Sequence, residues 1–80
     1  MEIDRLVTMA NQIADYFKAE PDVKEGVAGT ASHMRRFWDP RMRTQILAHV
    51  AAHGASGLNP IALAAVGVLA EQAKAQPVAK

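Results

Sequence analysis

The sequence contains no cysteine, and this absence excludes disulfides, thiolate metal ligands and a cysteine nucleophile. Aromatic residues are also scarce, at 5% of a chain that is 50% hydrophobic, so alanine supplies much of the apolar content and favours helix. No apolar run is long enough to cross a membrane, because residues 58–70 are too few and are interrupted by Asn59 and Pro60. The acidic N-terminus does not resemble a signal peptide. We therefore expect a small cytoplasmic protein with no membrane partner.

Charge is nearly balanced overall but is unevenly distributed along the chain. The formal net charge is +1, which by itself predicts no polyanionic partner. Residues 1–25 carry six acidic and three basic side chains, whereas residues 26–53 carry four arginines and a single acid, Asp39. The sequence thus predicts a molecule with an acidic end and an arginine-rich region.

Apolar residues recur at three- and four-residue steps through most of the chain, which predicts an all-α fold with no strand and no internal repeat. Eighty residues are expected to form one small helical domain, residues 1–80, in which residues 76–80 are a frayed tail. The architecture expected is a small bundle of four short helices. Their expected ranges are residues 3–19, 22–38, 40–53 and 60–75.

Two Asx-Pro pairs, Asp39-Pro40 and Asn59-Pro60, predict the starts of the third and fourth helices. The residue before a proline is pushed out of the α region, Asp and Asn cap helix N-termini, and proline suits the first helical position. Gly54 is the candidate residue for ending the third helix. The fourth helix is apolar on nearly all sides, so we expect it to be either central in the fold or covered by a partner.

Gly26 and Gly29 fall inside the second expected helix. Each weakens a helix by about 1 kcal/mol relative to alanine if it is interior and exposed. Alternatively, the two glycines permit the close approach of a neighbouring helix. The sequence leaves both interpretations open.

Combinations of residues that could support catalysis or bind a metal are weak. His49 and His53 lie four residues apart on one helical face, as in two-histidine zinc sites, but the glutamate of the His-Glu-x-x-His pattern and a third ligand are missing. The alternative is an exposed last turn, where histidine suits the helix dipole. Ser32 beside His33 is no nucleophile–base pair, because neighbouring side chains on a helix diverge. We expect no catalytic, cofactor-binding or metal-binding residue in this chain.

The stretch from His33 to Arg43 contains the only Trp and four of the nine basic residues. Arginine beside aromatic residues is typical of protein-recognition hot spots. The alternative is that Phe37 and Trp38 close the core while the arginines are solvated, and both can hold if one aromatic points inward and the other outward. A free-standing nucleic-acid-binding module is a further alternative, although four arginines make a weak electrostatic footprint. The predicted partner-binding residues are Arg35, Arg36, Phe37, Trp38, Arg41, Met42 and Arg43.

Several motifs together resemble a known family. They are Met9-Ala-Asn-Gln-Ile13, Phe17, Pro21, His33-x-x-Arg36-Phe-Trp-Asp-Pro-Arg-Met-Arg43 and Gly57-Leu58-Asn59-Pro60. In these motifs the chain resembles the delta subunit of NAD-dependent, molybdenum-containing formate dehydrogenase. The resemblance covers nearly the whole chain, and the Phe-Trp-Asp-Pro-Arg-Met-Arg run is its most specific part.

The resemblance implies a non-catalytic accessory subunit that supports assembly or stability of a cytoplasmic enzyme complex. It implies no cofactor in this subunit. The molybdenum bis-guanine-dinucleotide cofactor, iron–sulfur clusters, FMN and NAD would belong to the larger subunits. The expected partner is one of those subunits, first of all the catalytic alpha subunit, and neither nucleic acid nor a membrane. A transient chaperone that delivers cofactor and then leaves is an open alternative.

Overall fold

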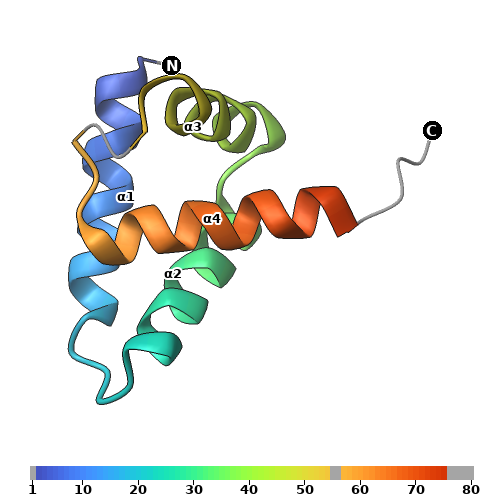
Figure 1. The fold of residues 1–80 in the computed structure, drawn as a ribbon. Helices are drawn as coiled ribbons and strands as arrows, with labels where there is room; N and C mark the ends of the chain where they lie inside the picture. Colours follow the sequence, from blue (N-terminus) through green and yellow to red (C-terminus); the bar gives the residue numbers. More distant parts are fainter. Residues whose placement is uncertain (1, 55–56, 76–80) are drawn as a thin grey trace.

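The computed structural model describes residues 2–54 and 57–75, and within these ranges the chain is helical and contains no strand. Its four helices are α1 (Ile3–Phe17), α2 (Val23–Phe37), α3 (Pro40–His53) and α4 (Pro60–Ala75) (Figure 1). The predicted all-α fold of four short helices is therefore confirmed. The expected frayed tail, residues 76–80, lies outside the described residues.

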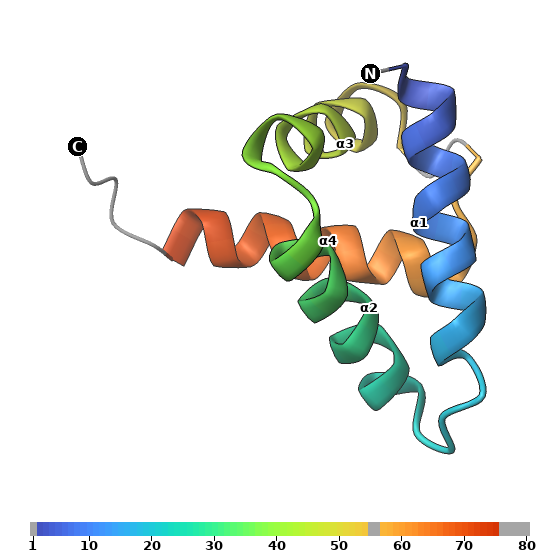
Figure 2. The same ribbon diagram turned by 180° about the vertical axis from the view of Figure 1, so that it is seen from behind.

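α1 and α2 are arranged as a V, and α3 and α4 pack against this pair. α1 and α2 run in opposite directions and are joined by residues 18–22, so the two helices meet at that end and diverge at the other (Figure 2). α3 lies at the open end of the V. α4 crosses one face of the α1–α2 pair and contacts all three other helices (Figure 1). The opposite face of the pair is consequently not covered by α4.

Two helix ends differ slightly from the predicted ranges. α1 ends at Phe17 and not at Ala19, and the carbonyl of Phe17 accepts a hydrogen bond from the N–H of Glu20 at 3.0 Å. α2 ends at Phe37, because Trp38 is already extended, with φ −85° and ψ 135°. The chain thus leaves the helix one residue before the Asp-Pro pair, and this change of direction precedes the start of α3.

Both Asx-Pro helix starts are confirmed. The Asp39 carboxylate accepts a hydrogen bond from the N–H of Met42 at 3.0 Å, and Pro40 is the first residue of α3. In the same way the Asn59 side-chain oxygen accepts from the N–H of Ala62 at 2.8 Å. Gly54 ends α3 with a φ of 68°, in the left-handed region that favours glycine.

The start of α4 is additionally fastened to α1. The Asn11 amide donates to the carbonyl of Gly57 at 2.8 Å, and its oxygen accepts from the N–H of Asn59 at 2.8 Å. The Asn59 amide in turn donates to Asp15 at 3.4 Å. These side-chain bonds join segments more than forty residues apart in the chain, so they fix the position of α4 on α1.

The two glycines of α2 permit a close approach of α1. A Cβ on Gly26 would lie 2.9 Å from the backbone oxygen of Phe17, and a Cβ on Gly29 would lie 2.6 Å from the Phe17 ring. Real Cβ atoms do not approach other atoms that closely, so Gly26 is required for this backbone approach, whereas a Cβ at position 29 would force the Phe17 ring to move. Of the two interpretations that the sequence leaves open, the structure supports close helix approach.

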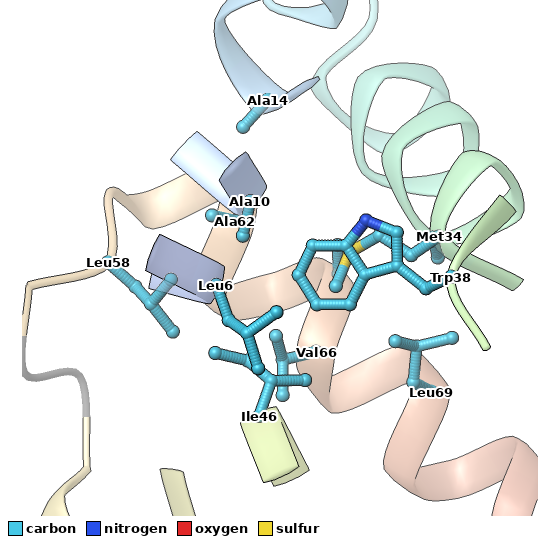
Figure 3. Close-up of a cluster of buried hydrophobic side chains, with 12 residues drawn as sticks. Leu6, Ala10, Ala14, Met34, Trp38, Ile46, Leu58, Ala62, Val66 and Leu69 are labelled. Atoms are coloured by element: carbon cyan, nitrogen blue, oxygen red, sulfur yellow. The ribbon is translucent and has the colours of Figure 1, made fainter. Parts of the chain in front are cut away.

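The core is built from inward side chains of all four helices, with Trp38 as its largest member (Figure 3). Trp38 is 4% exposed and belongs to one buried cluster with Leu6, Met34, Ile46 and Val66. From α4 the cluster takes small and medium side chains, namely Ala62, Ala65, Val66 and Leu69. Of the two predicted roles for α4, the central one is found, since these residues pack against the other helices.

Candidate partner-binding groove

The two aromatic residues of the predicted partner-binding stretch point in opposite directions. Trp38 is buried at 4% exposure, whereas its neighbour Phe37 is 70% exposed. The prediction that one aromatic lies inward and the other outward is therefore what the structure shows. Trp38 therefore offers almost no surface to a partner, while Phe37 presents most of its surface to solvent.

The four arginines of the stretch also divide into two groups. Arg43 donates from Nη1 to the carbonyl of Arg35 at 2.9 Å and to that of Trp38 at 2.8 Å. Two carbonyls at the end of α2 are thereby satisfied by a cation from α3, which is a favourable position for positive charge. Arg35, Arg36 and Arg41 are exposed. Arg43 thus has a structural role between helices, and the other three are accessible to a partner.

An apolar groove runs beside the exposed Phe37, between α1, α2 and the start of α3. It has a volume of about 680 Å³ and is open to solvent along its length. Apolar and aromatic side chains dominate its lining, and the polar side chains among the described lining residues are Gln12, Tyr16 and His33. None of the described α4 residues lines it, so it lies on the face of the α1–α2 pair that α4 leaves uncovered. The lining residues are Met9, Gln12, Ile13, Tyr16, Phe17, His33, Phe37, Trp38 and Met42.

The aromatic walls of the groove come from two helices. On α1, Tyr16 is 78% exposed and meets Phe17 edge-on, with ring centroids 5.0 Å apart. On α2, the His33 ring packs against Phe37 at 4.7 Å. Two large aromatic side chains therefore stand exposed on opposite walls of one apolar groove, an arrangement that fits a polypeptide binding surface.

The sequence predicted one wall of this groove and missed the other. Phe37, Trp38 and Met42 are predicted partner-binding residues that line it, whereas Met9 and Tyr16 belong to the wall that was missed. The missed signal is the width of the apolar stripe on α1. Met9 and Ile13 are partly buried against the core, and the stripe continues from them to Tyr16, which is exposed.

The histidine pair gives no sign of a metal centre. The rings of His49 and His53 lie 5.3 Å apart in a tilted arrangement. Within residues 2–54 and 57–75, no group of three or more His, Asp or Glu side chains is placed to hold a metal ion. In the same ranges no helix has the length and apolarity to cross a bilayer.

Comparison with known proteins gives one match. The family described as NADH-dependent formate dehydrogenase delta subunit FdsD matches residues 5–66. Searches of the curated proteins and of the solved structures each returned no match. The matched range runs from the first turn of α1 to the middle of α4, and so includes both Asx-Pro corners and every residue that lines the groove. The chain belongs to the FdsD family of formate dehydrogenase delta subunits.

Proposed function

We propose that this chain is a non-catalytic accessory subunit that supports the assembly or stability of an NAD-dependent, molybdenum-containing formate dehydrogenase. The observation that carries the proposal is the family match over residues 5–66. Its partners are the larger subunits of the complex, first of all the catalytic alpha subunit. We place the contact at the groove and at two exposed residues beside it, Arg36 and Phe37.

The exposed surface supports a docking role. Tyr and Arg are enriched at the centres of protein interfaces, and the side of the molecule that carries the groove combines Tyr16, Phe37 and the exposed Arg36. A domain of this size also buries only a modest core, so a permanent partner would stabilise it.

The lining of the groove argues against chemistry in this subunit. Iron–sulfur clusters are held chiefly by cysteine thiolates, which this chain lacks. Flavin and nucleotide sites need several polar groups around phosphates and rings, whereas the described lining of the groove offers Gln12, Tyr16 and His33 and no cationic side chain. The molybdenum cofactor, the clusters, FMN and NAD would accordingly be bound by the larger subunits.

The test is a tagged pull-down of this chain from its native cell, with mass spectrometry of the captured proteins. We expect the larger formate dehydrogenase subunits in stoichiometric amounts, and a lower yield of intact complex from cells that lack this chain. If the mature, cofactor-loaded enzyme is captured, the chain is a resident subunit. Capture only of a cofactor-free alpha subunit would identify a transient assembly factor instead.

A nucleic-acid-binding role predicts a different result. The captured material would then contain nucleic acid, and its retention would fall steeply as salt is raised. Recovery of nucleic acid without any formate dehydrogenase subunit would overturn the accessory-subunit proposal.

A further inference from the structure

The groove between α1 and α2 carries positive charge at only one end. Arg5 lies one helical turn before Met9 on α1, and Arg36 lies three residues after His33 on α2; both are exposed. Side chains three or four residues apart on a helix share a face, so each arginine stands beside a residue that lines the groove. Because α1 and α2 run in opposite directions, Arg5 and Arg36 are both at the open end of the V, near α3 (Figure 2).

The opposite end of the groove is uncharged at its walls. There it is bounded by Tyr16 and Phe17 on α1, close to the glycines of α2. Lys18 falls two residues after Tyr16, and side chains at that spacing do not share a face. Two arginines, Arg5 and Arg36, therefore flank the groove at the end near α3, where the exposed Asp39 caps that helix, and none of the described lining residues at the Tyr16 end is charged.

The other exposed arginines point away from the groove. Arg35 is two residues from both His33 and Phe37, so it lies on another side of α2. Arg41 lines a separate shallow hollow with Pro40, Thr44 and Gln45. This separation supplies matched controls, since Arg35 and Arg36 are adjacent and equally basic but only Arg36 borders the groove.

We propose that the groove binds an amphipathic helix of a larger formate dehydrogenase subunit, with the C-terminal end of that helix and its carboxylates beside Arg5 and Arg36. An apolar groove between helices can take the apolar face of another helix, and a partner cannot bind by adding a strand to a sheet edge because the described residues contain no strand. The negative end of the bound helix dipole and any Asp or Glu in its last turn would meet the two guanidinium groups.

The length of the groove sets the pattern of the bound helix. Met9 and Tyr16 are about two helical turns apart, or roughly 10 Å. The partner should present apolar side chains at i, i+3 or i+4, and i+7, followed within one turn by Asp or Glu. The inference rests on the proposed function, because the helix belongs to a larger subunit of the same complex.

Site-specific photocrosslinking in the assembled complex tests both the occupant and its direction. A photoreactive phenylalanine analogue would replace Tyr16 at one end of the groove and, in a second variant, Phe37 at the other. Mass spectrometry of the crosslinked peptides should identify one helix of one larger subunit in both variants. The Phe37 crosslink should fall about one to two turns closer to the C-terminus of that helix than the Tyr16 crosslink.

Several results would overturn the inference. These are crosslinks to a second copy of this chain, crosslinks in the reverse order, and crosslinks to a segment that lacks carboxylates. The same probe at Ala64, which is exposed on α4, serves as the control. A complex that forms but crosslinks only through Ala64 would refute the groove and leave the accessory-subunit proposal intact. If no complex forms even with the unmodified chain, both proposals fail.

Charge reversal gives an independent measurement. Arg36→Glu should weaken the association of the chain with the larger subunits by about tenfold or more, and raising the salt concentration should reduce this difference. Arg35→Glu is the matched control and should leave association within about twofold. Equal losses in the two variants would contradict the proposed position of the carboxylates.

Discussion

The two Asx-Pro corners begin with the same local chemistry and differ in what surrounds them. At Asp39-Pro40 and at Asn59-Pro60, a capping side chain accepts a hydrogen bond from a backbone N–H three residues ahead. The Asn59 corner is then tied inward by Asn11, and Leu58 before it is buried. The Asp39 corner also follows a buried residue, Trp38, but the preceding Phe37 is exposed and the corner borders an open groove.

The Asn59 corner therefore only stabilises the fold, whereas the Asp39 corner also carries side chains that a partner can contact. The side-chain bonds from Asn11 to the Asn59 corner leave few polar groups there for a partner. At the Asp39 corner, Trp38 and Arg43 hold the chain in place from the inside. The neighbouring residues Phe37 and Arg36 consequently face solvent from a backbone whose position is fixed by Trp38 and Arg43. The substitutions below are ordered by the size of the effect expected on folding.

Replacement of Trp38 should have the largest effect on folding. Trp38→Ala removes the largest core side chain and should lower the free energy of unfolding by about 3–5 kcal/mol. Urea denaturation followed by circular dichroism measures the change. Phe37→Ala is the matched control, because a largely exposed side chain should change stability by less than about 1 kcal/mol. Similar losses of unfolding free energy in the two variants would contradict the finding that Trp38 is buried and Phe37 exposed.

Loss of the Asn59 side chain should have the second largest effect. Asn59→Ala removes the cap of α4 and a bond to Asp15, and should cost about 2 kcal/mol of unfolding free energy. Its association with the larger subunits should be unchanged under conditions where the variant is folded. A selective loss of association would show that the Asn59 corner also takes part in docking. The two corners would then not differ in the way described above.

The two arginines of α3, Arg41 and Arg43, should differ in how much each stabilises the Asp39 corner. Arg43→Ala leaves two carbonyls at the end of α2 without their donor and should cost about 1–2 kcal/mol of unfolding free energy. Arg41→Ala should stay within about 0.5 kcal/mol, since its side chain is exposed and makes no such bonds. Thermal or urea unfolding of the two variants measures the change in unfolding free energy of each. A stability loss for Arg41→Ala as large as that for Arg43→Ala would be inconsistent with the structure.

The fold was predictable because its signals are local. Apolar periodicity gave the number of helices, and the Asp-Pro and Asn-Pro pairs gave the starts of α3 and α4 at the observed residues. The ends of α1 and α2 were misplaced by one or two residues, since no proline or glycine stands at those positions. Arrangement in space was less predictable: the hydrogen bonds from Asn11 to residues 57–59 join distant segments.

The candidate site was predicted in part for the same reason. A run of arginine and aromatic residues is visible in the sequence, and it identified Phe37 and Trp38. The sequence could not assign which ring is buried, because that depends on the backbone turning at Trp38. Nor could it show that Tyr16 on α1 and Phe37 on α2 line the same groove, since that requires the packing of α1 on α2.

The central claim is that the Asp39 corner docks through its outward residues, and Phe37 tests it most directly. The tagged chain carrying Phe37→Ala would be compared with the unmodified chain and with Asn59→Ala in copurification of the larger formate dehydrogenase subunits. Circular dichroism would confirm that each purified variant is folded. We expect Phe37→Ala to be the more stable of the two variants and to lose most of the bound complex, as truncation of an aromatic hot spot costs about 2 kcal/mol or more of binding. Full retention of the complex by folded Phe37→Ala, together with its loss from folded Asn59→Ala, would contradict the account.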